Sequence, residues 1–376
     1  MGKKQKIRAE FRKQHQGRTR KKDLTRDLAR ESLTEDDLLK SERVSGKGEL
    51  TRKRTVIGQE ADSQTTGLFV RRDVDAATTL PGRVLSVHGL ASSVRTDDGR
   101  MFQCATRRLL KNLNTGQRHV VAAGDVVYFR PESATTGLIE RIEPRTSILS
   151  RTSKQRQHVI VTNVDQLFIV ASAAEPHLKP NLIDRFLVEA ERLAIEPVIC
   201  INKIDLVEPA DLLPLAGVYG QMGYEVLLLS AATGVGVAKL RRLAAGKESV
   251  FAGQSGVGKS SLLNAIEPNL ALKVREVSRE NQKGKHTTTV ARLIPLAMGG
   301  YVVDTPGIRQ FQLWDIIPEE VAGYYRDLRP HAGLCRFPNC THTHEVHCAV
   351  KDAVADGRLD VRRYESYCHL RSGDME

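Results

Sequence analysis

The sequence has no apolar run that approaches the ~18 residues needed to suggest a membrane span, and no apolar stretch follows its basic start to make a signal peptide. Aromatic residues are almost missing from positions 1–80, which are rich in Lys, Arg, Asp, Glu and Thr. These absences argue against a membrane span, and we expect a cytoplasmic protein with no membrane partner. They also predict that residues 1–80 form a basic, largely disordered extension, with at most a short helix in 26–42.

Acidic residues are scarce at the start of the chain, where positions 1–22 hold ten Lys or Arg and one Glu, a net charge of +9. The whole chain carries a formal charge of +12, so most of the excess belongs to this tail. Such a run is a natural ligand for a phosphate backbone. A solubilising or purely disordered terminus is an equal alternative.

Cysteine is also sparse, and its placement does not suggest the disulfide framework of a secreted protein. The chain has six cysteines: Cys104, Cys200, Cys335, Cys340, Cys348 and Cys368. The string CRFPNCTHTHEVHC places three of them and a histidine at the spacing C-x4-C-x-H-x5-C. Three thiolates and one imidazole predict one structural, tetrahedral Zn²⁺ per chain. The predicted ligands are Cys335, Cys340, His342 and Cys348. Free cytosolic thiols are the alternative.

What the chain does contain, 40% apolar and 27% charged residues over 376 positions, gives a soluble protein room for two or three cores. Short β-like strings broken by HG and DDG turn signals predict a small barrel over 81–155. Periodicity leaves an OB-fold, an SH3-like barrel and part of a sandwich open, and we favour the OB-fold, as an RNA-binding domain.

Beyond residue 155, strand-like and helix-like strings alternate, which predicts an α/β domain over 156–317 with helices on both faces of a parallel sheet. From about Pro318 the chain is helical and histidine-rich, which predicts a third domain over 318–376. The fold class is therefore multidomain: an N-terminal β-barrel, a central α/β domain and a C-terminal α-helical zinc-binding domain. In open α/β sheets, ligands bind beyond the carboxyl ends of strands.

A phosphate-binding loop is indicated by GQSGVGKS, which fits G-x-x-x-x-G-K-[ST] between a strand-like string and a helix-like string. Its backbone N–H groups would wrap the phosphates, the lysine would reach the β and γ oxygens, and a hydroxyl would hold Mg²⁺. A Gly-rich turn alone explains the glycines but not Lys259 and Ser260 together. The candidate phosphate ligands are Gly253, Gln254, Ser255, Gly256, Val257, Gly258, Lys259, Ser260 and Ser261.

Two further strings complete a guanine-nucleotide site. In YVVDTPG, about 45 residues after the phosphate loop, Asp304 suits the Mg²⁺ shell and the Gly307 N–H suits the γ-phosphate. In INKIDL, Asp205 can accept from the guanine N1 and N2 hydrogens, whereas adenine presents the wrong donors and would leave an aspartate buried beneath it unpaired. The remaining base-site candidates are Asn202 for the opposite purine edge, Lys203 for the ring face, Ile204 within the loop, and the pair Ser230 and Ala231.

The order of these strings, with NKID before the phosphate loop, resembles the circularly permuted GTPases. The strings GQSGVGKSSLLN, GKHTTT and DTPGIRQF, and the tail CAVKDAVADGRLDVRRYESYCHL, resemble the RsgA type, the small ribosomal subunit biogenesis GTPases, over about residues 80–376. The resemblance implies a GTPase that binds the small (30S) ribosomal subunit and its rRNA during late maturation and hydrolyses GTP to GDP with stimulation by the subunit. We expect a monomer. The family's Glu-Pro before the last cysteine reads Glu345-Val346-His347 here, so His344 and His347 are possible substitute ligands.

The same resemblance makes GKHTTT switch I, with Thr288 or Thr289 closing on Mg²⁺ and the γ-phosphate. Ile308 stands where many GTPases carry a water-orienting glutamine, so we expect slow intrinsic hydrolysis. Our hypothesis is that His286 orients the water once the subunit fixes the switch. The alternative is that His286 contacts RNA or packs. An RNA-binding assembly factor with little turnover, and an ATP-dependent enzyme that NKID disfavours, are the competing functions.

Overall fold

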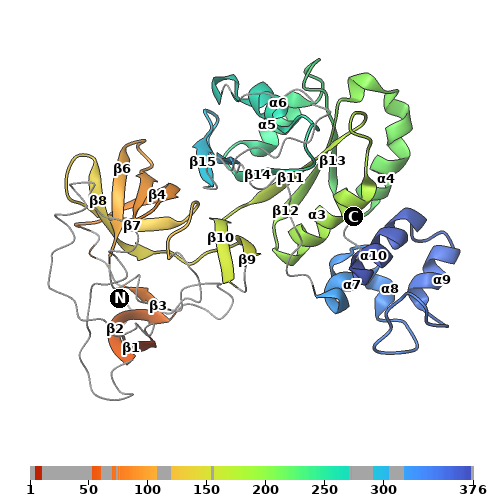
Figure 1. Cartoon of the computed structure of the whole chain (residues 1–376), viewed down its shortest axis with the longest axis horizontal. Helices are drawn as coiled ribbons and strands as arrows, with labels where there is room; N and C mark the ends of the chain where they lie inside the picture. The colour runs from red at the N-terminus through yellow and green to blue at the C-terminus, as the bar shows by residue number, and fades with distance from the viewer. Residues whose placement is uncertain are drawn as a thin grey trace. The chain divides into compact units, whose positions relative to one another are not determined.

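The computed structural model (Figure 1) describes residues 5–10, 53–60, 70–72, 75, 77–107, 120–153, 156–270, 272, 291–304 and 317–373. The chain divides into two compact units, Met1–Arg145 and Thr146–Glu376, and each is described by itself. Among the helices of these ranges, none has the length and apolar character needed to cross a membrane. The domain boundaries at 155/156 and 317/318 stay predictions.

Three short strands form an antiparallel sheet within the first 80 residues. They are β1 (Gln5–Glu10), β2 (Lys53–Glu60) and β3 (Val70–Arg72), with β2 in the centre. The sequence predicted little regular structure there, because a polar composition indicates that a segment cannot build a hydrophobic core. A ladder of backbone hydrogen bonds needs no apolar side chains, so composition does not reveal it. The short helix expected in 26–42 lies outside the described residues.

The first unit also contains a closed five-stranded barrel with the strand order β4-β5-β6-β8-β7. Its strands are β4 (Leu80–His88), β5 (Ala91–Arg95), β6 (Met101–Thr106), β7 (Val126–Pro131) and β8 (Thr136–Ile142). Neighbouring strands are antiparallel except β6 and β8, which pair in parallel. This Greek-key closure confirms the OB-fold among the barrel types that periodicity left open.

The barrel is filled by side chains that alternate inward along each strand. Phe102 and Phe129 are buried at its centre, with ring centroids 4.9 Å apart. A Cβ at Gly137 would lie 2.7 Å from the Phe129 ring, so glycine lets β8 close against that ring. The interior is packed rather than open, and ligands would meet the outside of the barrel or its loops.

The second unit begins with a hairpin, β9 (Ile148–Ser153) and β10 (Arg156–Thr162), followed by a six-stranded sheet. The sheet order is β13-β12-β11-β14-β16-β15. Its strands are β11 (Gln166–Ser172), β12 (Glu196–Asn202), β13 (Glu225–Leu228), β14 (Glu248–Ala252), β15 (Arg292–Pro295) and β16 (Tyr301–Asp304). All pairs are parallel except β15 with β16.

Helices cover both faces of this sheet, as the alternating pattern predicted (Figure 1). On one face α5 (Val237–Ala244) and α6 (Lys259–Ile266) bury Leu240 and Leu262 against Phe168 and Val170 of β11. The other face is covered by α3 (Pro180–Arg192) and α4 (Leu213–Gln221). Three short 3-10 turns complete the unit's central part: η2 (Ile204–Leu206) and η3 (Pro209–Leu212) precede α4, and η4 (Pro268–Leu270) follows α6. The sequence did not predict α4, whose string LPLAGVYGQ contains two glycines and a proline.

The C-terminal segment is helical, as predicted. It contains η5 (Pro318–Glu320), α7 (Val321–Tyr324), α8 (Arg329–Ala332), α9 (Ala349–Ala355) and α10 (Val361–Ser372). Its core includes the buried rings of Tyr325 and Tyr367 and extends to Val188 of α3. The segment is therefore packed directly on the α/β part of the same unit.

Candidate nucleotide site and metal centre

The carboxyl ends of the five parallel strands lie on the same side of the sheet, and the predicted nucleotide motifs follow these ends. Ser172 at the end of β11 lies opposite Asn202 at the end of β12. Asp304 ends β16, which pairs in parallel with β14, the strand before the phosphate loop. The reversed order of the motifs along the chain is therefore compatible with one site in space.

The phosphate loop depends on three glycines whose backbone angles other residues rarely adopt. The φ angle is 144° at Gly253, 85° at Gly256 and 93° at Gly258. A Cβ at Gly253 would overlap the carbonyl oxygen of Val170 in β11. Helix α6 begins directly after the loop and has no side-chain N-cap, which leaves its first N–H groups to an anion.

Lys259 is hydrogen-bonded to the backbone of the phosphate loop. Its Nζ donates to the carbonyl oxygens of Gly253 and Gln254, each at 2.7 Å. Ser255 is exposed at the tip of the loop, and the hydroxyl-bearing Ser260 and Ser261 lie in the first turn of α6, half-buried. The loop and the first turn of α6 therefore bring together a cation, hydroxyls and helix N–H groups, which is the chemistry that a polyphosphate needs.

Asn202 joins the base loop to the phosphate loop. It is buried, its Nδ2 donates to the carbonyl of Val257 at 2.9 Å, and its Oδ1 accepts from the N–H of Ala231 at 3.2 Å. Three of the predicted motifs are thus tied together by one amide side chain. Sequence analysis gave Asn202 to the purine edge, and the structure adds that its oxygen and one N–H hold the loops.

The other base-site candidates lie in the loops that follow β12 and β13. Asp205 is exposed, and its Oδ1 accepts from the buried Ser230 hydroxyl at 2.5 Å. Lys203 has a left-handed φ of 63°, and its Nζ donates to the carbonyl of Glu175 at 2.5 Å. Ile204 is buried and anchors the turn. A carboxylate of fixed orientation thus stands beside an extended lysine stem.

Four predicted catalytic residues fall outside the described residues: His286, Thr288, Thr289 and Gly307. For Asp304 the structure gives the backbone position at the end of β16.

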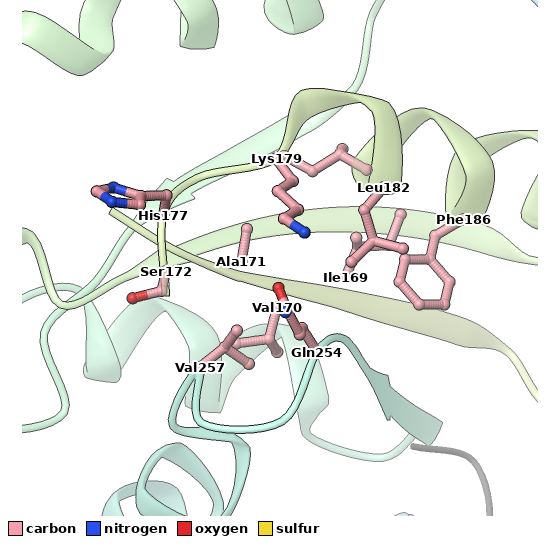
Figure 2. A pocket seen from close by; sticks show the side chains of 11 residues that line it. Ile169, Val170, Ala171, Ser172, His177, Lys179, Leu182, Phe186, Gln254 and Val257 are labelled. Atoms are coloured by element: carbon pink, nitrogen blue, oxygen red, sulfur yellow. The ribbon is translucent and has the colours of Figure 1, made fainter. Parts of the chain in front are cut away.

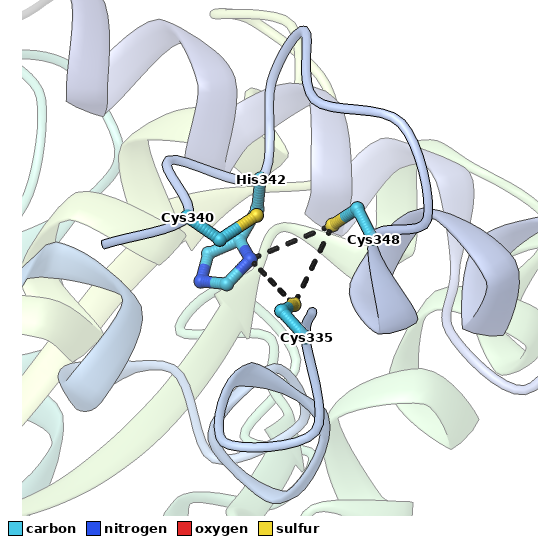
Figure 3. A group of neighbouring side chains, drawn as sticks. All are labelled: Cys335, Cys340, His342 and Cys348. Atoms are coloured by element: carbon cyan, nitrogen blue, oxygen red, sulfur yellow. Dashed lines mark hydrogen bonds between the residues drawn. The ribbon is translucent and has the colours of Figure 1, made fainter. Parts of the chain in front are cut away.

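A compact group of metal-ligating side chains lies in the C-terminal segment (Figure 3). The ligand atoms of Cys335, Cys340, His342 and Cys348 all lie within 4.8 Å of one another. The Nδ1 of His342 is 3.3 Å from the Sγ of Cys335 and 3.5 Å from the Sγ of Cys348. His344, one of the two possible substitutes, is 81% exposed at its side chain, and the other, His347, is exposed as well; neither joins the group.

The surroundings of this group suit its histidine to metal binding and support its loop. Burial lowers the pKa of His342, which keeps the imidazole neutral as a metal ligand requires. The hydroxyls of Tyr364 and Tyr367 in α10 donate to the carbonyls of His342 and Thr341 at 2.8 and 2.7 Å. The group can therefore hold a metal ion, and α10 braces the loop that presents it.

Comparison with known proteins agrees with the geometry. The model of the family described as RsgA GTPase matches residues 142–314. The Small ribosomal subunit biogenesis GTPase RsgA of Sodalis glossinidius is 40% identical over 292 residues, which cover 76% of this chain and 83% of the relative. The chain belongs to the RsgA GTPase family. The protein of the same name from Chlorobaculum parvum is 40% identical over 303 residues, covering 78% of this chain and 97% of that one.

Solved structures of RsgA-like proteins share the architecture. YjeQ from Thermotoga maritima superimposes with a TM-score of 0.66 at 35% identity, covering 78% of this chain and 98% of that chain. YloQ, described as a circularly permuted GTPase, gives a TM-score of 0.63 at 32% identity, covering 80% and 97%. The circular permutation predicted from motif order is thereby confirmed.

Sequence reasoning missed one feature of this RsgA-family site, a hollow between α3 and the phosphate loop (Figure 2). Ile169, Ile183 and Phe186 line it together with Lys179 and Gln254. In Figure 2 the Lys179 side chain extends from α3 over β11. Periodicity identified α3 as a helix but carried no signal that its first turns border the phosphate loop.

Gly258→Ala is expected to weaken GDP binding about tenfold or more, because a Cβ there would overlap Asn202 Nδ2 and a φ of 93° is strained for alanine. Titration with a fluorescent GDP analogue measures the effect. The matched control is Gly246→Ala, which has a comparable φ of 73° but no neighbour within 4 Å of its Cβ. Equal affinities for the two variants would contradict the packing role of Gly258.

Proposed function

We propose that this protein is a GTPase that binds the small ribosomal subunit and assists its late maturation, with hydrolysis stimulated by the subunit. The observation that carries the GTP assignment is the Asn202 bridge, which joins the base loop and the phosphate loop in one site. The names of the relatives, small ribosomal subunit biogenesis GTPases, support the choice of partner. We propose that the protein acts in the cytoplasm, where it would meet the subunit, and that it acts as a monomer.

In the proposed site, Asp205 and the Lys203 stem read guanine, and the Ser230–Ala231 pair supports the base loop. Gly253 to Ser261 would hold the phosphates, with Lys259 leaving its carbonyl partners for the β and γ oxygens. A magnesium ion bound with GTP would supply charge compensation at those oxygens, and we assign Ser260, Asp304 and Thr288 or Thr289 to hold it. The Gly307 N–H would meet the γ-phosphate.

The domain assignments follow the same proposal. The barrel of 81–155 would bind rRNA, the GTPase domain would span 156–317, and the helical domain of 318–376 would hold one structural zinc ion. The extension of 1–80 would add non-specific attraction to RNA through its basic tail, an attraction that falls as salt rises.

GTP hydrolysis measured with and without purified small subunits tests the proposed function. We expect slow turnover alone, because Ile308 cannot orient a water molecule, and a large increase with the subunit. GTP binding without turnover in either condition would favour the RNA-binding assembly factor, in which GTP is only a bound ligand. Equal hydrolysis of ATP would favour an ATP-dependent enzyme.

His286→Ala is expected to abolish most of the increase that the subunit produces, by a factor of about 10²–10⁴, while GTP affinity stays near wild type. The reason is that an imidazole near its pKa at working pH can orient and deprotonate the attacking water. Single-turnover hydrolysis with the subunit and nucleotide titration without it separate the two effects. Unchanged stimulated turnover would leave His286 to RNA contact or packing.

A further inference from the structure

Helix α3 borders the nucleotide site with its first turns. Lys179 precedes the helix at its N-cap, and Ile183 and Phe186 line the hollow that Gln254 of the phosphate loop also lines. The loop of 173–179 that leads into α3 carries the Glu175 carbonyl that accepts from the base-loop lysine at 2.5 Å. The placement of α3 and its leading loop therefore influences both halves of the nucleotide site.

The C-terminal segment lies beside α3 (Figure 1), and Val188 of α3 is part of its core. Asp184, adjacent to Ile183, is 1% exposed, and its Oδ1 accepts from Arg363 Nη1 of α10 at 2.5 Å. Tyr219 of α4 donates its hydroxyl to the same oxygen at 2.8 Å. Three helices that are distant in sequence thus meet at one buried carboxylate.

Arg363 is buried and contacts a second carboxylate and an aromatic ring. It is 2% exposed, its Nε and Nη2 both donate to the Asp327 carboxylate at 2.9 Å, and its guanidinium lies 4.3 Å from the centroid of the Tyr325 ring. Burial raises the pKa of Asp184, and the charge of Arg363 opposes that rise. Without Arg363, Asp184 would keep a buried carboxyl group with no compensating charge, and α3 would lose its fixed partner.

We propose that Arg363 is a positioning residue for guanine-nucleotide binding. By pairing with Asp184 it fixes the first turns of α3 and the loop of 173–179, which in turn holds Lys203 in place for the base. This role rests on the proposed function only in that the ligand is a guanine nucleotide. It gives the C-terminal segment a direct influence on nucleotide affinity through α3.

A second ion pair between the same two parts provides the matched control. Arg326 Nε lies 2.5 Å from Glu191 Oε1, and its guanidinium lies 4.2 Å from the centroid of the Tyr224 ring. Glu191 is in the last turn of α3, whereas Asp184 is in its second. Removing Arg326 therefore weakens the attachment of the C-terminal segment without releasing the end of α3 that borders the nucleotide.

The experiment is a titration of the full-length Arg363→Met, Arg363→Lys, Asp184→Asn and Arg326→Met proteins with fluorescent GDP, at a temperature well below each melting temperature. We expect the Kd to rise about tenfold for Arg363→Met and Asp184→Asn, and less than about threefold for Arg363→Lys and Arg326→Met. All four are expected to lower the melting temperature. A purely structural role would lower melting temperatures without changing the Kd of the folded protein.

A Kd within twofold of wild type for both Arg363→Met and Asp184→Asn would overturn the positioning role, and so would an equal rise for Arg326→Met. The double variant Arg363→Met/Asp184→Asn gives a further check, because partners in one interaction are expected to be non-additive. Fully additive changes in the Kd would also contradict the proposal. Failure of the wild-type protein to bind GDP would instead refute the proposed function, and is seen in the same titration.

Discussion

Asp205→Asn is expected to change the base preference of the site from guanine to xanthine. A carboxylate accepts from guanine N1–H and N2–H, whereas an amide presents a donor that matches the 2-oxo group of xanthine. Sites that hydrogen-bond a specific group discriminate strongly against an analogue without it, so GTP affinity should fall about a hundredfold or more while XTP binding appears. The Ser230 hydroxyl at 2.5 Å fixes the orientation of the group that is exchanged.

Competition of GTP, XTP and ATP for a bound fluorescent nucleotide measures this change. Asp211→Asn is the matched control, because Asp211 is an exposed acid in the same stretch of chain that makes no described contact with the base loop. It is expected to keep the wild-type order of affinities. Retained GTP preference in Asp205→Asn would remove Asp205 from base recognition.

Cys348→Ser is expected to abolish metal binding and to unfold much of the C-terminal segment. Cys348 is 1% exposed and is one of the four grouped ligands. A serine hydroxyl at that position is a poor zinc ligand, and the loss of a structural zinc site destabilises a small domain because the free energy of metal binding contributes directly to its folding. The helices α7, α8 and α9 are too short to be stable without tertiary contacts.

Metal analysis of the purified protein together with circular dichroism and thermal melting tests this expectation. Cys368→Ser is the control, since Cys368 lies in α10 outside the metal-ligating group and is expected to leave the metal content unchanged. Absence of zinc from purified, active wild-type protein would contradict the zinc assignment. Another metal held by the same four ligands would change the identity of the ion and leave the site in place.

Several elements followed from local sequence because the local signal and the tertiary environment agree. The string NLIDRFLVEAERLAI forms α3, and VDQLFIVASA forms β11, which has a neighbouring strand on each side. The barrel strands were located by turn signals, but periodicity did not distinguish an OB-fold from its alternatives. That distinction depends on which strands pair, and the parallel pairing of β6 with β8 is a long-range contact.

Some residues of the candidate site could likewise be predicted from local sequence, and others could not. Gly253, Lys259 and Asp205 were identified because phosphate and guanine chemistry requires those residue types at fixed local spacings. The double role of Asn202 was missed, because its second partner, Val257, lies 55 residues away along the chain. Arg363 gave no signal at all, since a single arginine in a charged helix resembles a solvent-exposed residue until its burial is known.

The sequence by itself was sufficient to predict the chemistry available to this protein: a phosphate loop, a guanine-binding loop, four candidate metal ligands and the order in which they occur. Each of these depends on residues close together in the chain, where spacing and residue type are sufficient. Only the tertiary structure decided how the parts are joined, through Asn202 between two loops and through Arg363 between α10 and α3. Those connections depend on burial and on contacts between residues far apart in the chain, which local spacing and residue type do not predict.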